Sequence, residues 1–306
     1  MPLPPDVRVY ETTQQAAEAL AAEVSRLSAA AIAERGRFTI ALSGGSTPAA
    51  LYALLAAPPH ASGIDWSSWH VFWGDERCVP PGHPDSNYGM ARRTLLDHVP
   101  IPPQQVHRMA GEDDPRRAAN AYAAVLAGTL GPGGRLDLAL LGVGDDGHTA
   151  SLFPNTTALS ETERSVAANW VPHLAAHRIT LTLPTLSRAR HVTVLATGAD
   201  KAHAVRRALA PRPSDATPPI ALVTPEDAPV AWYLTEDAAP STHRHSRESR
   251  NPETAAPTRR SRAGGNPDAS QPIVRPDAAP TVRPEPVEGP LSTSSSHPAN
   301  DLKGQG

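Results

Sequence analysis

A short apolar run followed by a polar loop and then a helical pattern occurs repeatedly in this chain, and this repetition constrains the fold more than any other feature. The first example is the run Phe38–Leu42, which leads into a loop with two adjacent glycines, and Pro48 then opens a helical pattern. We expect strands at 38–42, 69–73, 136–141, 178–183, 191–196 and 230–234, and helices at 12–35, 48–55, 86–96, 115–130 and 199–209. Such alternation predicts an α/β fold with a mostly parallel sheet covered by helices on both faces.

The pattern stops before the end of the chain. All 13 aromatic residues lie at or before Tyr233, whereas 11 of the 34 prolines fall within 240–306. The segment 240–306 therefore lacks the bulky apolar groups that offset the conformational entropy lost on folding. Two short sequence motifs each occur twice within it. We predict one α/β domain at 1–239 and a disordered, low-complexity tail rich in Pro, Arg and Ser at 240–306.

Charge and cysteine content exclude several classes of function. The predicted domain carries a formal charge of −5 and the tail +2, which argues against nucleic acid as a partner. The single cysteine, Cys78, excludes a disulfide framework within the chain, and the histidines show no paired metal-ligand spacing. No apolar run is long enough to cross a membrane, and the first 15 residues lack a secretory signal pattern. We expect a cytoplasmic protein, monomeric or a weak homo-oligomer, without metal or other cofactor.

Two loops that follow predicted strands suit a phosphate group. In the loop 43–47, the adjacent glycines let backbone N–H groups converge at the start of a helix, although an ordinary capped turn would have the same letters. In 74–77, Arg77 could bind a phosphate in a bidentate manner, with Asp75 or Glu76 holding the guanidinium or a substrate hydroxyl. A solvated charge cluster is the alternative for this second loop.

The loop 142–148 follows the predicted strand 136–141 and ends in His148. Its letters match a dinucleotide-binding loop, but two aspartates lie between the glycines and would repel a pyrophosphate. An imidazole beside carboxylates is instead suited to general-base catalysis, because a carboxylate can fix its tautomer. The alternative is a structural histidine.

Lysine is rare in this arginine-rich chain and occurs only at Lys201 and Lys303. Lys201 follows the predicted strand 191–196 at the start of a helix, where its ammonium could bind a phosphate or a developing negative charge. A solvated surface lysine is the alternative.

Taken together, these loops resemble the 6-phosphogluconolactonase family. The matching stretches are Ser43-Gly44-Gly45-Ser46-Thr47-Pro48, Trp73-Gly74-Asp75-Glu76-Arg77, Asp85-Ser86-Asn87-Tyr88-Gly89, the run 142–154 (GVGDDGHTASLFP), Arg178-Ile179-Thr180-Leu181-Thr182 and 198–201 (GADK). They follow one another in family order over roughly residues 5–239. The resemblance implies a Rossmann-like three-layer α/β/α domain that acts on a small phosphosugar lactone.

The resemblance also implies residue roles. His148 would be the catalytic base, and the loop 44–46 would bind the substrate phosphate together with Arg77 and Lys201. The catalytic set that we expect is His148, Asp75 and Arg77. The substrate-binding set that we expect is Ser43, Gly44, Gly45, Ser46, Thr47, Asn87, Asp145, Arg178 and Lys201, of which Asn87, Asp145 and Arg178 would line the sugar pocket with Asp75.

The expected reaction is hydrolysis of 6-phospho-D-glucono-1,5-lactone to 6-phospho-D-gluconate, the second step of the oxidative pentose phosphate pathway. An amino-sugar phosphate deaminase-isomerase on the same fold is the first alternative, but that family tends to have Ile-Ala-Phe-Asn-Glu-Pro after its Gly-His and a tyrosine in place of Arg77. This chain instead has Thr-Ala-Ser-Leu-Phe-Pro at 149–154. A sugar-phosphate-sensing regulator, or an interaction protein that acts through its Pro-rich tail, are further alternatives.

Overall fold

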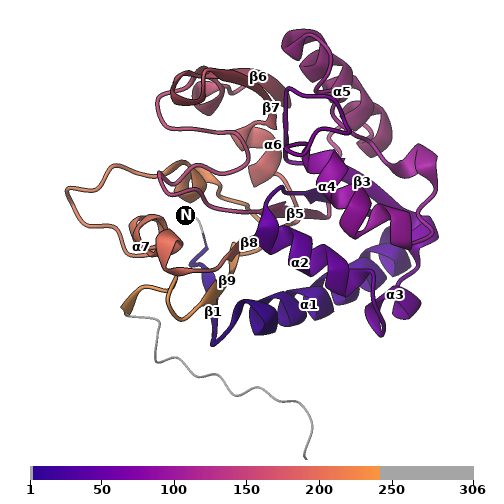
Figure 1. Cartoon of the computed structure of the whole chain (residues 1–306), viewed down its shortest axis with the longest axis horizontal. Coiled ribbons are helices and arrows are strands. Elements are labelled where there is room, and N and C mark those ends of the chain that lie inside the picture. The colour runs from indigo at the N-terminus through magenta and orange to yellow at the C-terminus, as the bar shows by residue number, and fades with distance from the viewer. Residues whose placement is uncertain (1–2, 242–306) are drawn as a thin grey trace, which may run out of the picture. The chain divides into compact units, whose positions relative to one another are not determined.

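A six-stranded parallel sheet forms the centre of the computed structural model, which describes residues 3–241 (Figure 1). Its strands are β1 (Asp6–Tyr10), β2 (Phe38–Leu42), β3 (Trp69–Trp73), β5 (Leu138–Leu141), β8 (His191–Ala196) and β9 (Ala231–Thr235). They lie in the order β1-β9-β8-β5-β2-β3, and every neighbouring pair is parallel. The carboxyl ends of these strands therefore meet at one edge of the sheet, which is the edge where such folds bind ligands.

A second, antiparallel sheet of three strands lies beside this edge. It contains β4 (Asp75–Arg77), β7 (Ala176–Leu181) and β6 (Val166–Val171), in the order β4-β7-β6. Gly74 connects the two sheets, because its N–H donates to Leu42 O and its carbonyl accepts from Leu181 N, both at 2.8 Å. The charged tripeptide after β3 is thus a strand, which places its side chains beside those of β7.

Helices cover both faces of the parallel sheet (Figure 1). They are α1 (Thr13–Arg35), α2 (Ser46–Leu55), α3 (His60–Gly63), α4 (Asn87–Thr94), α5 (Pro115–Leu130), α6 (Leu183–Ser187) and α7 (Ala202–Leu209). Short 3-10 turns occur at Trp66–Ser68, Leu96–His98, Pro103–Gln105, Thr157–Ser160, Pro172–Leu174, Ala199–Lys201 and Pro219–Leu222. Side chains alternate across each strand, so that Ile40 and Leu42 pack with α1 and α2 while Ala41 packs with α5 and the second sheet.

Local sequence signals explain where the long helices begin and end. The Thr12 side chain accepts from Gln15 N and the Gln15 side chain accepts from Thr12 N, which forms a capping box at the start of α1. Gly36 ends this helix in the left-handed region at φ 71°. Asp114 caps α5 in a similar way by accepting from Arg116 N and Arg117 N. The predicted helices at 12–35 and 115–130 are confirmed.

The predicted fold class is confirmed, and the strands at 38–42, 69–73 and 191–196 have the predicted bounds. Several bounds differ. Helix α2 begins at Ser46, two residues before Pro48, and the helix expected at 86–96 ends at Thr94. The strand expected at 178–183 is shifted to 176–181, and the helix expected at 199–209 begins with a 3-10 turn. Strands β1, β4 and β6 were not predicted.

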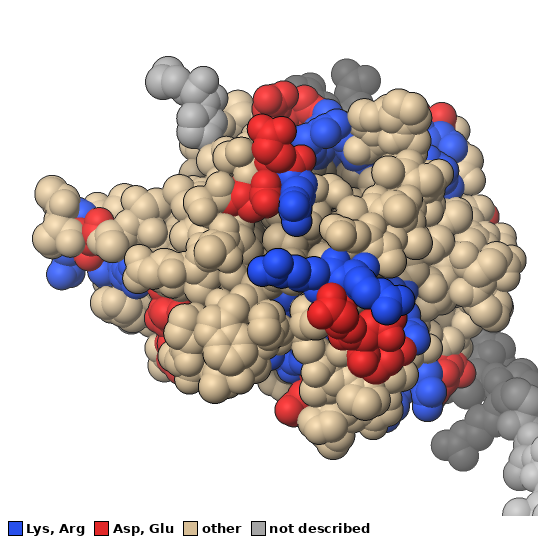
Figure 2. All heavy atoms as spheres, turned by 90° about the horizontal axis from the view of Figure 1, so that it is seen from above, with Lys and Arg blue, Asp and Glu red and all other residues tan. Residues whose placement is uncertain are grey.

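Charged side chains lie in small groups of mixed sign on the face shown in Figure 2. Wide uncharged areas separate these groups. Opposite charges lie side by side in these groups. Among the described residues, no helix is both long enough and apolar enough to span a membrane.

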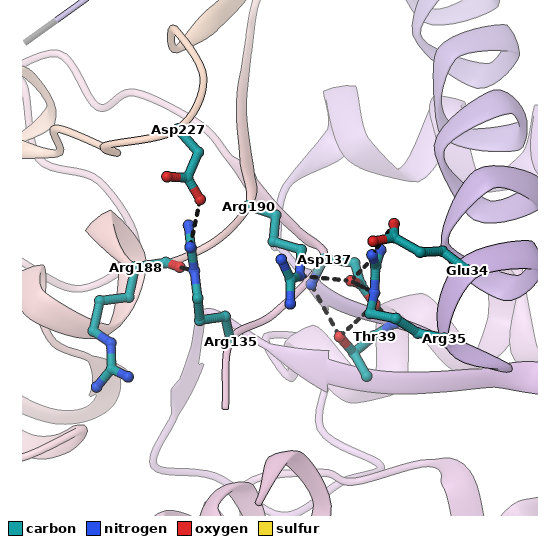
Figure 3. Close-up of polar contacts among 8 residues, drawn as sticks. All are labelled: Glu34, Arg35, Thr39, Arg135, Asp137, Arg188, Arg190 and Asp227. Atoms are coloured by element: carbon teal, nitrogen blue, oxygen red, sulfur yellow. Dashed lines mark hydrogen bonds and ion pairs between the residues drawn. The ribbon is translucent and has the colours of Figure 1, made fainter. Parts of the chain in front are cut away.

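A buried carboxylate joins four elements at the opposite, amino edge of the sheet (Figure 3). Asp137 precedes β5 and accepts from Thr39 N at 2.8 Å, Thr39 Oγ1 at 2.9 Å and Arg35 Nε at 3.1 Å. Arg190, which precedes β8, places its Nε 3.4 Å from Asp137 Oδ1. This cluster fixes the end of α1 and the starts of β2, β5 and β8, away from the edge that carries the predicted site.

The predicted tail at 240–306 lies outside the described residues except for Pro240 and Ser241. Pro240 is buried, as are Ala238 and Ala239. The described residues therefore include the first two residues of the predicted tail.

Candidate active site

One cleft collects most of the residues that the sequence singles out. It has a volume of about 320 Å³ and lies at the carboxyl ends of β2, β5 and β8. The expected site residues that line it are Ser43, Gly44, Gly45, Ser46, Thr47, Asp75, Arg77, Asn87, His148 and Lys201. The loop residue Thr197 also lines it.

A second cavity of about 610 Å³ adjoins the first. The two cavities share the lining residues Asp75, Arg77, His148 and Ala150. The remaining expected site residues, Asp145 and Arg178, line this second cavity. The site therefore has two lobes with His148 at the boundary between them.

The glycine loop owes its shape to two close approaches. A Cβ atom on Gly44 would lie 1.8 Å from Asn87 Oδ1, so only glycine lets this loop pack against the start of α4. Gly45 has a φ of 112° and immediately precedes α2, whose N-terminal backbone N–H groups and dipole favour an anion. Tyr52 OH accepts from Ser43 N at 2.9 Å and donates to Ser43 O at 2.8 Å, which fixes the start of the loop.

Three neighbours fix the imidazole of His148. Its Nδ1 lies 2.7 Å from Asp146 Oδ1, which also accepts from the His148 backbone N at 2.9 Å. The Phe153 ring stacks on the imidazole with a centroid distance of 4.0 Å and an interplanar angle of 28°. A Cβ atom on Gly144 would lie only 2.0 Å from His148 Cε1, so the absence of a side chain there makes room for the ring.

The contact with Asp146 determines what His148 can do chemically. Burial alone would raise the pKa of the Asp146 carboxyl, but hydrogen bonds from the His148 backbone and imidazole outweigh it and hold this pKa below its usual range. Asp146 is therefore a carboxylate at neutral pH. An anionic acceptor at Nδ1 favours the tautomer with its proton there, which leaves Nε2 as the basic nitrogen.

The neighbouring aspartate has a different partner. Asp145 Oδ1 lies 2.5 Å from Lys201 Nζ, and Asp200 Oδ2 lies 3.0 Å from the same nitrogen. Burial opposes the charge on Lys201, but these two contacts outweigh it and raise the pKa of the ammonium group. Lys201 therefore remains a cation at the mouth of the cleft.

The residues after β3 are held by neutral donors. Asp75 Oδ2 accepts from Ser151 Oγ at 2.6 Å, and Asp75 Oδ1 accepts from Asn87 Nδ2 at 3.2 Å. Glu76 is buried and accepts from Asn87 N and Tyr88 N, so it stabilises the start of α4.

The Arg77 guanidinium does not pair with either of the two carboxylates considered in the sequence interpretation. Its Nη1 instead donates to the carbonyl of Asp85 at 2.8 Å. Among the described residues, the Arg77 guanidinium forms no ion pair with Asp75 or Glu76, whose oxygens accept from the donors just described.

Sequence reasoning missed four residues of the site: Asp146, Ser151, Phe153 and Thr197. Three of them lie within the run 142–154 that carries the resemblance, which is the one signal that could have pointed to them. Thr197 Oγ1 lies 3.2 Å from Thr47 Oγ1 and so joins the glycine loop to the loop after β8. Among the described residues, no group of three or more His, Cys, Asp and Glu side chains could hold a metal ion.

Comparison with known proteins agrees with this geometry. Residues 11–232 match the family described as glucosamine-6-phosphate isomerases/6-phosphogluconolactonase. The chain belongs to this family. The match includes the glycine loop, the run 142–154 and Lys201, so the family assignment covers every element that lines the two cavities.

Individual members of the glucosamine-6-phosphate isomerase/6-phosphogluconolactonase family are similar over most of their length. The chain is 43% identical over 213 residues to the 6-phosphogluconolactonase of Synechocystis, with 68% of this chain and 86% of the relative covered. It is 42% identical over 216 residues to the 6-phosphogluconolactonase of Streptomyces coelicolor, with coverage of 67% and 83%.

Solved structures of the family share the fold. The 6-phosphogluconolactonase from Trypanosoma cruzi superposes with a TM-score of 0.70 at 31% identity, and covers 78% of this chain and 97% of its own. A monomeric glucosamine-6-phosphate deaminase superposes with a TM-score of 0.63 at 21% identity, with coverage of 76% and 98%, which shows a common fold alone.

Proposed function

We propose that this protein hydrolyses 6-phospho-D-glucono-1,5-lactone to 6-phospho-D-gluconate, the second step of the oxidative pentose phosphate pathway. The observation that carries the proposal is the position of His148, which lies beside an anionic acceptor in a cleft that also contains a glycine loop and a lysine. Relatives at 42–43% identity that are named 6-phosphogluconolactonase support the same activity. We further propose that the protein acts in the cytoplasm as a monomer or weak homo-oligomer, without nucleic acid.

The phosphate of the substrate binds in the lobe formed by the glycine loop. There the N-terminus of α2 offers backbone N–H donors, the hydroxyl groups of Thr47 and Thr197 lie together, and Lys201 adds a positive charge. The phosphate is remote from the reacting carbon, so its binding energy positions that carbon beside His148.

His148 acts as the general base in this mechanism. Its Nε2 takes a proton from a water molecule as the water oxygen attacks the lactone carbonyl carbon. The imidazolium then gives that proton to the departing ring oxygen, while the Asp146 carboxylate stabilises the positive charge that forms on the imidazole. General acid–base catalysis of this type accelerates a reaction roughly 10²- to 10⁴-fold.

The test is to generate the lactone freshly and to measure its decay with and without the full-length protein, since the lactone also opens spontaneously. We expect decay well above the spontaneous rate, a loss of most of this acceleration in His148→Ala, and none in the matched control His98→Ala. His98 lines neither cavity, and its side chain contacts the Arg93 carbonyl. Decay at the spontaneous rate with the wild-type protein would contradict the function. Wild-type activity of His148→Ala would contradict only the assignment of the base.

A further inference from the structure

Two arginines face one another beside His148 without an acidic partner. Arg77 and Arg178 are directly opposed in the antiparallel pairing of β4 with β7, and both line the second cavity. Arg77 Nη1 donates to Asp85 O at 2.8 Å, and Arg178 Nη1 donates to His177 O at 3.1 Å. Within residues 3–241, neither guanidinium forms an ion pair with a carboxylate.

This arrangement is unfavourable in the absence of an anion. Burial, and next the positive charge of Arg77, lower the pKa of the Arg178 guanidinium. The charge of Asp75 acts in the opposite direction, but its carboxylate hydrogen-bonds with Asn87 and Ser151 and forms no ion pair with either arginine. Two partly buried cations that lack a counter-ion are stabilised when a ligand supplies the negative charge.

The position of the pair indicates which part of the ligand that charge belongs to. The glycine loop and Lys201 line the first lobe, Arg178 lines the second, and His148 and Arg77 line both. Phe153 and Leu174 contribute apolar walls to the second lobe, which strengthens electrostatic interactions there. A substrate whose phosphate lies in the first lobe and whose reacting carbon lies at His148 would direct its carbonyl oxygen toward the arginine pair.

We propose that Arg178 and Arg77 bind the oxygen atoms on C1, first as the oxyanion of the tetrahedral intermediate and then as the carboxylate of the product. This inference rests on the proposed function, and it moves Arg77 from the phosphate end of the substrate to the reacting end. A planar guanidinium matches a carboxylate through two parallel hydrogen bonds.

The chemistry of the step balances with groups already named. The water oxygen forms a bond to C1, and the carbonyl π electrons move onto the carbonyl oxygen, whose negative charge faces the arginines. The bond between C1 and the ring oxygen then breaks, and the ring oxygen receives from His148 the proton that came from water. The carboxylic acid so formed releases its remaining proton to solvent and leaves a carboxylate beside the two cations.

The test compares two stable ligands that differ only at C1. 6-Phosphogluconate carries a carboxylate at C1, whereas glucitol 6-phosphate carries a hydroxymethyl group there. Binding of each to the full-length protein is measured by calorimetry for the wild type, Arg178→Gln, Lys201→Gln and the control Arg26→Gln. Arg26 lies on the exposed surface of α1 and pairs with Glu23.

We expect Arg178→Gln to weaken 6-phosphogluconate binding roughly 10- to 100-fold and to leave glucitol 6-phosphate binding within about twofold. Lys201→Gln should weaken both ligands by a similar factor, and Arg26→Gln neither. Arg178→Lys keeps the charge without the planar fork and should recover only part of the affinity. Retained binding of glucitol 6-phosphate shows in the same experiment that the variant is folded.

Two outcomes would overturn the inference. Equal weakening of both ligands by Arg178→Gln would assign Arg178 to the phosphate end, and unchanged binding of both would remove it from the site. These results are independent of the assay of the proposed function. If the wild type fails to accelerate lactone decay but Arg178→Gln still weakens only 6-phosphogluconate binding, the proposed reaction is wrong and the carboxylate subsite stands.

Discussion

At the scale of single residues, the missing side chain at residue 144 makes room for the imidazole of His148. The backbone φ of Gly144 is not in the left-handed region, so alanine would be tolerated by the backbone, yet its Cβ would lie 2.0 Å from His148 Cε1. Gly144→Ala should therefore displace the ring and lower kcat roughly 10²-fold, because misplacement of a catalytic group by about 1 Å costs that much. The kcat of the variant is measured from lactone decay after subtraction of the spontaneous rate.

The chain offers a matched control two residues earlier. A Cβ atom on Gly142 would have no neighbour within 4 Å, and this glycine also lies outside the left-handed region. Gly142→Ala should leave kcat close to that of the wild type. Equal losses in both variants would mean that the loop as a whole, rather than the space beside His148, limits activity.

Asp146 gives a second prediction for the same imidazole. Replacement by Asn keeps the size of the side chain but removes the charge that stabilises the imidazolium, so kcat should fall roughly 10- to 10³-fold. Asp145→Asn should act on KM instead, since Asp145 pairs with Lys201. Steady-state kinetics of the two variants separate these effects, and a larger loss of kcat in Asp145→Asn would contradict the assignment.

The stability advantage of the wild type over Asp146→Asn should also depend on pH in a defined direction. Burial opposes the charge on Asp146, but hydrogen bonds from His148 outweigh it and hold the pKa of this carboxyl below its ordinary value of about 3.9. A lowered pKa stabilises the fold above the unfolded pKa, and this contribution is lost as the pH falls through the folded pKa. The difference in unfolding free energy between wild type and variant should thus be largest above about pH 5 and shrink progressively as the pH falls below it, as measured by urea denaturation.

These two aspartates also show what the sequence could not resolve. The motif correctly indicated a carboxylate beside His148, but adjacent aspartates have the same chemistry, and only the turn at 144–147 decides which one faces the imidazole. Gly147, at φ 90°, turns the chain so that Asp146 contacts the ring while Asp145 reaches Lys201. Phe153 was missed for a related reason, because stacking on His148 depends on the path of the chain between them.

At the scale of elements, the amino edge of the sheet depends on Asp137. Its carboxylate is buried and accepts from Thr39 and Arg35, so it links α1, β2 and β5. Asp137→Ala would leave Thr39 N–H and the Arg35 guanidinium without this acceptor, and Arg190 without its ion-pair partner. We expect the free energy of unfolding to fall by roughly 3 to 5 kcal/mol, as is typical when one partner of a buried ion pair is removed.

Because the Asp137 cluster lies away from the cleft, substitutions there should lower the free energy of unfolding without changing kcat. The cleft lies at the carboxyl ends of the strands, so kcat of the folded Asp137→Ala protein should remain near that of the wild type at a temperature well below its melting point. Asp227→Ala is the control, because Asp227 pairs with Arg135 at the surface and should cost less than about 1 kcal/mol. A loss of kcat in Asp137→Ala without unfolding would contradict this separation.

Elements with local signals were predicted from the sequence, and elements without them were not. Helix α1 has a capping box and a terminal glycine, and β2, β3 and β8 are apolar runs that end in polar loops. Strand β4 consists of three charged residues with no alternation, and it is a strand only because β7 pairs with it. Such pairing between distant segments is a tertiary effect, which is why the second sheet and the opposed arginines were not predicted.

At the scale of the whole molecule, the two sheets create the two lobes of the site. The parallel sheet supplies the glycine loop, His148 and Lys201 from its carboxyl edge, whereas the antiparallel sheet supplies Arg77 and Arg178. Gly74 joins the sheets through hydrogen bonds to both. We propose that the phosphate binds in one lobe and C1 in the other. This arrangement follows from the way the two sheets meet.

The ends of the domain show how much of the chain the site requires. Every residue that lines the two cavities lies between Ser43 and Lys201, and β9 completes the parallel sheet at Thr235. After β9, Glu236 N donates to Tyr10 O, and Ala238 and Pro240 are buried. A protein that ends at Ser241 keeps all of these contacts, whereas one that ends at Ala239 loses the buried Pro240.

We therefore expect the 1–241 protein to match the full-length chain in kcat, KM and melting temperature. The 1–239 protein should keep the same kcat at low temperature and melt lower, because a buried ring and its flanking backbone are removed. Lactone decay and thermal unfolding, measured side by side on the three proteins, test both statements. A loss of activity on truncation at 241 would show that the segment 242–306, poor in the large apolar residues of the domain, nevertheless contributes to catalysis.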